Sequence, residues 1–329
     1  MKLLLELSME CESLARSEAL SIGRTIGSRS DAVLVDEGIL VIDTDADPIA
    51  FVERMALCHS ASEYMCSCNP EDVQEFSSAI DVPGPVRVHA TRIGTAHEHV
   101  DLAELNSSVG AVLGDAVGVD IHNPCSEVRI VFSDKVHIGR LIGSVDRAAY
   151  ERRKTKNLPF NHPISLHPKF ARCIVNLVEV RPGKRILDPF CGTGAIVTEA
   201  ALAGAEAIGS DVSEKMVDGA RSNMTSVGVK GRLHICDVGS ISDVVKHVDG
   251  IATDPPYGRS SSTNGEPVPD LIRRAFGSLS KIMDAGSRLV MVMHDPALAD
   301  CAEDFELIES HELWVHRSLT RHFCVFVRR

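Results

Sequence analysis

The feature that most constrains the fold is a strand, a glycine-rich turn and a helix that follow one another from residue 185. Residues 185–187 predict a strand, and the turn after it holds Gly192 and Gly194. Glycines at such a turn let the backbone come close to a ligand at the helix N-terminus. This unit opens a doubly wound parallel sheet, so we expect an α/β, Rossmann-like domain over residues 164–329.

Two cofactors are compatible with this turn, a dinucleotide and S-adenosylmethionine. The dinucleotide fingerprint is Gly-x-Gly-x-x-Gly, but the third glycine position, counted from Gly192 and Gly194, is Val197. Asp188, which follows the strand, would repel a pyrophosphate but tolerates a cationic sulfonium. The sequence therefore favours S-adenosylmethionine.

Three further predicted strands also end in acidic residues. They are 205–210 before Asp211, 232–235 before Cys236 and Asp237, and 248–253 before Asp254. The carboxyl ends of parallel strands meet at one edge of a sheet, which is where ligands bind in open α/β folds. One acid at a strand end is usually a cap, but four polar strand ends facing one crevice favour a cofactor site. We expect Asp211 at the cofactor ribose and Asp237 at the adenine amino group.

The fourth of these strand ends carries the motif Asp254-Pro255-Pro256-Tyr257. Two prolines stop the strand and fix the backbone, which holds the carboxylate and the neighbouring carbonyl oxygens in one place. On local evidence alone the motif could be an ordinary strand stop with a turn. Beside a cofactor crevice, however, the motif indicates a rigid part of a ligand-binding site.

Residues 188–194 and 254–257 resemble the cofactor loop and the catalytic motif of class I S-adenosylmethionine-dependent amino-methyltransferases. Over nearly the whole chain the sequence resembles the single-chain, THUMP-containing tRNA guanosine-10 N2-methyltransferases. The segments that support this narrower resemblance are 168–172, 258–262 and 315–321. The resemblance implies N2-methylation of guanosine 10 in tRNA, carried as far as the dimethyl product.

This resemblance also implies two sets of site residues. The catalytic set is Asp254, Pro255, Pro256 and Tyr257. The cofactor-binding set is Asp188, Phe190, Cys191, Gly192, Thr193, Gly194, Asp211, Val212, Asp237, Val238 and His167.

The N-terminal half has a different pattern, in which helices and short β-rich runs alternate without a catalytic cluster. Strands at 2–8, 32–35 and 39–42 and helices at 11–27 and 48–57 predict an α+β, ferredoxin-like module over residues 1–57. Residues 86–94, 102–105 and 119–124 resemble a THUMP domain, which we place at 58–146. That resemblance implies an α/β fold that binds structured RNA, with tRNA as the partner.

The charge of the chain allows only local contacts with RNA. The net charge of −12 excludes a general nucleic-acid coat. The segment 147–163 is basic and then carries prolines, and we expect it to be a linker, either solvated or in contact with phosphates. The expected RNA contacts are Arg87, Arg92, Arg152, Arg153, Lys154, Arg259, His316 and Arg317.

Several other classes of protein are disfavoured by the sequence. The apolar run 3–5 is too short to span a membrane and is followed by Glu6 and Glu10, so we expect a cytoplasmic protein. The ten cysteines lack regular spacing, which indicates reduced thiols. The cluster Cys58, His59, Cys66 and Cys68 lacks the paired spacing of a zinc ribbon, so no metal is expected, nor is a helper subunit.

Two other functions share part of this pattern. An adenine-N6 methyltransferase acting on DNA or another RNA could use the same motif at Asp254, but the THUMP-like half favours tRNA. A non-catalytic RNA-binding protein could retain the fold, but the intact Asp254 and the intact glycines favour catalysis.

Overall fold

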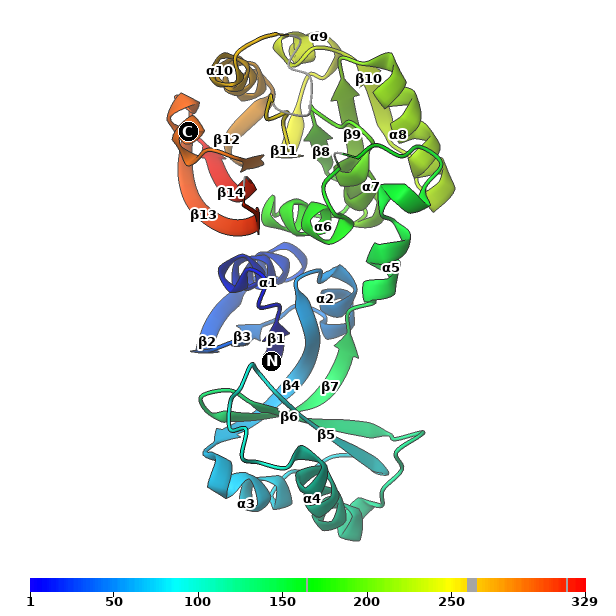
Figure 1. Ribbon diagram of the computed structural model, residues 1–329, viewed down its shortest axis with the longest axis vertical. Coiled ribbons are helices and arrows are strands. Elements are labelled where there is room, and N and C mark those ends of the chain that lie inside the picture. Colours follow the sequence, from blue (N-terminus) through cyan, green and yellow to red (C-terminus); the bar gives the residue numbers. More distant parts are fainter. Residues whose placement is uncertain (164, 259–264, 318) are drawn as a thin grey trace. The chain divides into compact units, whose positions relative to one another are not determined.

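The chain folds into two compact units in the computed structural model, which describes residues 1–163, 165–258, 265–317 and 319–329. Unit 1 consists of Met1–Glu12, Ile26–Glu53 and Cys58–Val145, and unit 2 of Ser13–Thr25, Arg54–Leu57 and Asp146–Arg329. Each unit contains one seven-stranded sheet (Figure 1). No helix in the described part of the chain is both long and apolar enough to span a membrane.

The sheet of unit 1 runs in the order β2-β3-β1-β4-β7-β6-β5. Its strands are β1 (Lys2–Leu7), β2 (Ser30–Asp36), β3 (Ile39–Thr44), β4 (Cys58–Cys68), β5 (Val86–Arg92), β6 (Ser126–Phe132) and β7 (Val136–Ser144). The named strands pair antiparallel except β5 and β6, which are parallel. Because β4 pairs with β1 on one side and β7 on the other, the segments 1–57 and 58–146 share one sheet.

The helices of unit 1 are α2 (Pro48–Arg54), η1 (Pro70–Asp72), α3 (Val73–Ser78) and α4 (Leu102–Val117). Alternate residues of β5 and β6 point at α4, so that Val86, Val128 and Ile130 pack against Val109 and Leu113. Figure 1 shows α3 and α4 side by side against this part of the sheet. Helix α4 begins directly after Asp101, whose side chain caps it by accepting from the amides of residues 103 and 104.

The sheet of unit 2 runs in the order β10-β9-β8-β11-β12-β14-β13. Its strands are β8 (Arg185–Asp188), β9 (Glu206–Asp211), β10 (Arg232–Ile235), β11 (Val248–Thr253), β12 (Met283–Met293), β13 (Phe305–His316) and β14 (Leu319–Arg328). The first five strands in this order are parallel, and β14 runs antiparallel to β12 and β13. This confirms the predicted doubly wound sheet, with its switch point between β8 and β11.

The helices of unit 2 surround this sheet. They are residues 13–25 of α1 (Glu12–Ile26), α5 (Arg147–Arg152), η2 (Thr155–Asn157), α6 (Pro168–Leu177), α7 (Ala195–Leu202), α8 (Glu214–Val227), η3 (Val238–Ser240), α9 (Ile241–Val244), α10 (Val268–Leu279), η4 (Ser280–Ile282) and η5 (Pro296–Cys301). Helix α1 thus belongs to unit 2, although the strands before and after it in the chain belong to unit 1.

A buried polar network fixes α1 in unit 2. The Glu18 carboxylate is fully buried and accepts hydrogen bonds from the Leu57 amide at 2.8 Å and from Asn176 Nδ2 at 2.8 Å. Asn176 Oδ1 in turn accepts from Arg54 Nε at 2.9 Å. Burial raises the pKa of Glu18 to about 7, although these hydrogen bonds oppose the shift. Residues 54–57 and α6 are therefore tied to α1 through side chains of unit 2.

The segment 147–163, which was expected to be a linker, packs into unit 2 instead. The Arg153 Nε donates to Glu199 at 2.6 Å, and Arg172 Nε donates to the other carboxylate oxygen at 3.0 Å. The Phe160 backbone exchanges two hydrogen bonds with the Asn223 side chain, each of 2.9 Å. A buried carboxylate such as Glu199 requires paired cations, which explains why Arg153 is drawn inward.

Candidate active site

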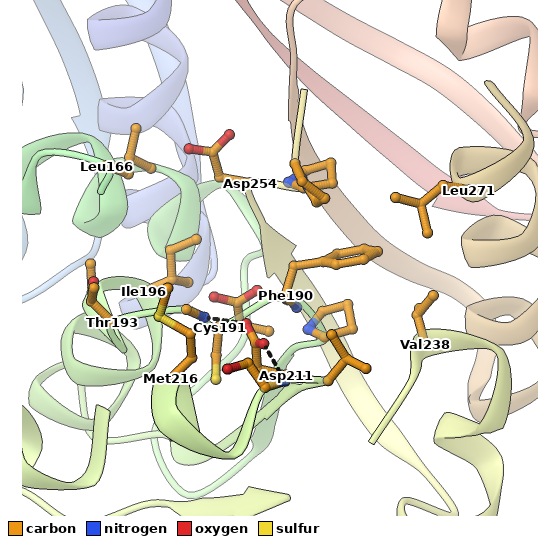
Figure 2. Close-up of a pocket in the computed structure, with 18 of the residues that line it drawn as sticks. Leu166, Phe190, Cys191, Thr193, Ile196, Asp211, Met216, Val238, Asp254 and Leu271 are labelled. Carbon is orange, nitrogen blue, oxygen red and sulfur yellow. Dashed lines mark hydrogen bonds between the residues drawn. The ribbon is translucent and has the colours of Figure 1, made fainter. Parts of the chain in front are cut away.

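A cavity of about 770 Å³ lies at the carboxyl ends of the parallel strands of unit 2. Residues after β8, β9, β10 and β11 line it, and further lining residues come from α10 and β14. In Figure 2, Phe190, Val238 and Leu271 lie on one side of the cavity, and Thr193, Ile196 and Met216 lie on the other. The predicted crevice at the switch point is thus present as a cavity with apolar walls and acidic groups.

The glycine turn after β8 forms part of the cavity lining. Gly192 and Gly194 have φ values of 48° and 83°, in the left-handed region that favours glycine. A Cβ at Gly194 would lie 2.9 Å from the Ala220 Cβ on α8, so this position also requires a residue without a side chain. Gly192 lines the cavity, whereas Gly194 packs against α8 and lies outside the lining.

Asp188 is the most buried acid of the cavity wall, with 2% of its surface exposed. Its Oδ1 accepts from Thr253 Oγ1 at 2.7 Å and from the Phe190 amide at 3.1 Å. Burial raises the pKa of Asp188 to about 7, and the neighbouring charges of Asp254 and Asp211 add to that rise.

Asp211 at the end of β9 accepts two backbone hydrogen bonds. The Gly192 amide donates at 3.0 Å and the Ser213 amide at 2.9 Å, and Figure 2 marks the bonds to this carboxylate with dashed lines. Burial nevertheless raises the pKa of Asp211. The carboxylate is therefore fixed in place and lines the cavity, where sugar hydroxyls could donate to it.

Asp237 has a cation partner that the sequence did not reveal. The Arg274 guanidinium on α10 donates to both oxygens of Asp237, and it also bonds to Glu266 with an Nε to Oε1 distance of 3.1 Å. Partial burial tends to raise the pKa of Asp237, but the bonds from Arg274 and the Gly239 amide outweigh it and lower the pKa. All three side chains line the cavity.

The motif that was predicted to be catalytic follows β11. Asp254, Pro255, Pro256 and Tyr257 all line the cavity, and the Tyr257 hydroxyl donates to Asp254 Oδ1. The Tyr257 ring lies with its centroid 5.0 Å from that of His294, at an interplanar angle of 37°. Burial raises the pKa of Asp254, while the nearby Arg321 guanidinium and the bond from Tyr257 lower it. The predicted catalytic residues are thus brought together with the predicted cofactor loop.

One predicted cofactor residue, His167, lies outside the cavity lining. Its Nδ1 accepts from the Lys169 amide at 3.2 Å, so the ring caps the N-terminus of α6, and its Nε2 lies 3.2 Å from Glu151. The other predicted cofactor residues, apart from Gly194, line the cavity: Asp188, Phe190, Cys191, Gly192, Thr193, Asp211, Val212, Asp237 and Val238.

The residues predicted to contact RNA mostly have protein partners. Arg87 pairs with Glu127, Arg92 donates to the Val100 carbonyl, Arg152 pairs with Asp146, Arg153 with Glu199, and Lys154 with Glu151. His316 and Arg317 are exposed at the end of β13, and Arg259 lies outside the described residues. Exposed ion pairs are weak, so Arg152 and Lys154 can still reach a phosphate, whereas Arg153 is held by a buried carboxylate.

The sequence did not identify several lining residues that come from distant parts of the chain. They include Ser165, Leu166, Met216, Glu266, Leu271, Arg274 and Arg321. Of these, Arg321 lay in a segment that had been singled out, residues 315–321. The described residues contain no cluster of three or more His, Cys, Asp or Glu side chains that could hold a metal ion.

The cavity fits S-adenosylmethionine better than a dinucleotide. Its volume lies in the usual range for small-molecule sites, roughly 300–1,000 Å³. Asp188, Asp211 and Asp254 line it together and would repel a pyrophosphate, whereas a sulfonium cation is compatible with them. The apolar side chains of Phe190, Val238 and Leu271 provide a surface for an adenine ring.

Comparison with known proteins supports this chemistry. Residues 155–322 match a family model described as an RMKL-like methyltransferase domain. The chain is 32% identical to a tRNA (guanine(10)-N2)-dimethyltransferase of Methanothermobacter thermautotrophicus, over 98% of each chain, and 28% identical to that of Pyrococcus abyssi, over 93% and 94%. Among solved structures, TrmN from Thermus thermophilus has a similar fold, with a TM-score of 0.58 and 21% identity over the whole of both chains.

Proposed function

The chain belongs to the family of the archaeal tRNA (guanine(10)-N2)-dimethyltransferases, and we propose that it methylates the exocyclic N2 of guanosine in tRNA. One observation carries this proposal: Asp254 and the two prolines after it line the same cavity as the cofactor turn at Gly192. We place the methylated guanosine at position 10 and expect the dimethyl product, because the archaeal relatives bear that name. A role in tRNA modification also agrees with the expected cytoplasmic location.

The acceptor amine is a poor nucleophile, because its lone pair is delocalised into the guanine ring. S-adenosylmethionine, when bound, supplies a methyl group activated by the sulfonium. The Asp254 carboxylate and the Pro255 carbonyl would each accept a hydrogen bond from N2, which turns the lone pair out of the ring and toward that methyl. N2 would take the methyl group with its lone pair, and the electron pair of the broken C–S bond would remain on sulfur. Asp254 or water would accept the N2 proton.

The other lining residues would hold the cofactor and the base. Asp211, fixed by the amides of Gly192 and Ser213, would accept from the ribose hydroxyls. Asp237, oriented by Arg274, would accept from the adenine amino group. The Tyr257 ring would stack on a guanine that has flipped out of the RNA helix. This stacking would offset the cost of unpairing and unstacking the base.

Unit 1 would bring the tRNA to this site, as expected from the THUMP resemblance of residues 58–146. Because the net charge is −12, we expect contacts at individual cations such as Arg152, Lys154 and Arg317. The proposed assignment needs neither a metal nor a helper subunit.

Nucleoside mass spectrometry of an unmodified tRNA transcript would test this function. The transcript is incubated with the protein and S-adenosylmethionine, and N2,N2-dimethylguanosine is expected at position 10. A matched transcript with adenosine at position 10 should gain no methyl group there. Appearance of N6-methyladenosine would reject the assignment in favour of an adenine methyltransferase, and N2-methylguanosine at a different position would reject position 10 alone.

A further inference from the structure

Arg321 is a cavity residue to which the proposed mechanism gives no role. It comes from β14, one residue before the pairing of His322 with Met293 at the end of β12. Its side chain lines the same cavity as Asp254 and Tyr257. The guanidinium lies close enough to lower the pKa of Asp254, and it also hydrogen-bonds to Tyr257. Arg321 therefore belongs to the amine-binding end of the cavity.

The Nε of Arg321 is a buried donor without a hydrogen-bond partner among the described residues. Buried donors in native proteins almost always have a partner, so an orphaned one on a cavity wall indicates that a ligand supplies the acceptor. The N–H cannot bind N2 of guanine, because an amino group conjugated with the ring is a donor and not an acceptor. It needs an oxygen or a ring nitrogen with a free lone pair.

We propose that Arg321 donates from Nε to an acceptor atom on the edge of the target guanine and thereby orients the base. This inference rests on the proposed function. Asp254 accepts and Arg321 donates, so the two side chains form an acceptor–donor pair. Guanine offers the complementary pair at N2 and N3, which are bonded to the same carbon. O6 is the second acceptor that the guanidinium could reach, on the far side of N1.

Arg321 orients the base and does not by itself select guanine. Adenine presents the same donor and acceptor order at N6 and N1, so an Asp254–Arg321 pair would fit that edge as well. The role of Arg321 is to fix which lone pair faces the methyl group. A small misplacement of the reacting atoms is costly in rate, so an orienting contact of this kind should be visible in the chemical step.

The test pairs two changes to the substrate with two changes to the protein. tRNA is prepared with 3-deazaguanosine, which lacks N3, or with 2,6-diaminopurine, which lacks O6, at the target position. Single-turnover methylation of each is measured with the wild type, with Arg321→Lys and with Arg321→Gln. The lysine variant keeps the charge beside Asp254 but has no Nε–H. Arg221→Gln, an exposed change on α8, is the matched control.

We expect 3-deazaguanosine to slow the wild type roughly 10–100-fold, the range for a hydrogen bond from a charged donor, and to slow the Arg321 variants no further. The Arg221→Gln control should be slowed by 3-deazaguanosine by the same factor as the wild type. The same pattern with 2,6-diaminopurine would support the contact and place it at O6. Equal slowing of wild type and variants by both analogues would overturn the proposal.

A cofactor contact is the other source of an acceptor, because S-adenosylmethionine carries a carboxylate. Calorimetry with S-adenosylmethionine separates the two, and we expect the dissociation constants of both variants to stay within about twofold of the wild type. A tenfold or greater loss would assign Arg321 to the cofactor and overturn the proposal. Failure of the wild type to methylate the guanosine transcript at all would instead reject the proposed function, and the inference with it.

Discussion

The two sheets carry similar acidic side chains in opposite electrostatic states. In unit 1, Glu127 is buried but pairs with Arg87 and Arg129, and these bonds outweigh burial and lower its pKa. In unit 2, burial raises the pKa values of Asp188, Asp211 and Asp254. Unit 1 thus places two cations beside Glu127, whereas unit 2 gathers Asp188, Asp211 and Asp254 around one cavity.

This difference distinguishes structural charges from functional ones. An acid that is paired with cations stabilises the fold, and its oxygen atoms have few free acceptor sites for a ligand. Several acids held close together are unfavourable in the free protein, and such clusters are typical of binding and catalytic sites. A cationic ligand in the cavity would relieve the repulsion between the acids of unit 2.

Replacing the central acid of the cavity should have the largest effect. Asp254→Ala removes the proposed acceptor for the N2 hydrogens, and we expect single-turnover methylation to fall by about 10³-fold or more. The dissociation constant for S-adenosylmethionine, measured by calorimetry, should change little. Full activity in this variant would remove Asp254 from the mechanism and with it the contrast between the two sheets.

Removing a cation from unit 1 should instead affect stability alone. Arg129 is 12% exposed and bonds to Glu6 at 2.8 Å and to Glu127 at 3.3 Å, so Arg129→Ala leaves two buried carboxylates short of a partner. We expect the free energy of unfolding to fall by about 3 kcal/mol, at the low end for a broken buried pair. Chemical denaturation measures this. A loss of cofactor affinity in this variant would contradict the structural role.

The ring of Tyr257 should contribute less than the Asp254 carboxylate. Tyr257→Ala removes the stacking surface, worth about 1–3 kcal/mol per base, and should raise KM for tRNA more than it lowers kcat. Tyr257→Phe keeps the ring and loses only the hydroxyl that donates to Asp254, so it is the matched control. Equal kinetics for the alanine and phenylalanine variants would exclude stacking.

The smallest effects should have opposite signs in the two units. The pKa of Asp188 is raised to about 7, so its proton stabilises the fold at low pH and that stability is lost as pH rises from about 4 to 7. Asp188→Asn keeps the acceptor for Thr253 and should stabilise the protein at pH 8 by about 1 kcal/mol. Thermal unfolding at pH 5 and pH 8 measures the change.

Asp36→Asn in unit 1 is the counterpart with the opposite sign. Burial tends to raise the pKa of Asp36, but the hydrogen bond with His137 at 2.8 Å and the bonds from the Lys135 and Glu37 amides together outweigh it, so the pKa is lowered. Its stabilising contribution is therefore present above pH 4 and lost in acid. The asparagine variant should be less stable than the wild type at pH 8 by about 1 kcal/mol. If Asp188→Asn and Asp36→Asn changed the stability at pH 8 in the same direction, the electrostatic contrast between the two units would be wrong.

The parts of the site that the sequence predicted depend on local chemistry. The turn at Gly192 needs a backbone that only glycine adopts easily, and the two prolines after Asp254 end a strand wherever they occur. Asp211 and Asp237 follow the ends of two predicted strands, so the parallel pattern of strands and helices placed both at the carboxyl edge of the sheet. These signals lie within a few residues of the groups they position, so they could be found without a structure.

The parts that were missed depend on contacts distant in the chain. Arg274 and Arg321 reach the cavity from α10 and β14, and a cation on an amphipathic helix or a strand is normally solvated. His167 was expected at the cofactor, but it directly precedes Pro168 and caps a helix. Residues 147–163 have the composition of a linker, yet the buried Glu199 recruits Arg153 from within them.

The position of α1 in unit 2 has a consequence for how the protein is made on the ribosome. Glu18 is synthesised early, but its partner Asn176 follows 158 residues later, which at bacterial and eukaryotic rates corresponds to roughly 10–30 seconds. Unit 1 can complete its sheet once β7 has emerged, while Asn176 on α6 has not yet been synthesised. The nascent chain must therefore carry Glu18 without this partner through much of its synthesis, and a fragment beginning at residue 146 would lack α1 altogether.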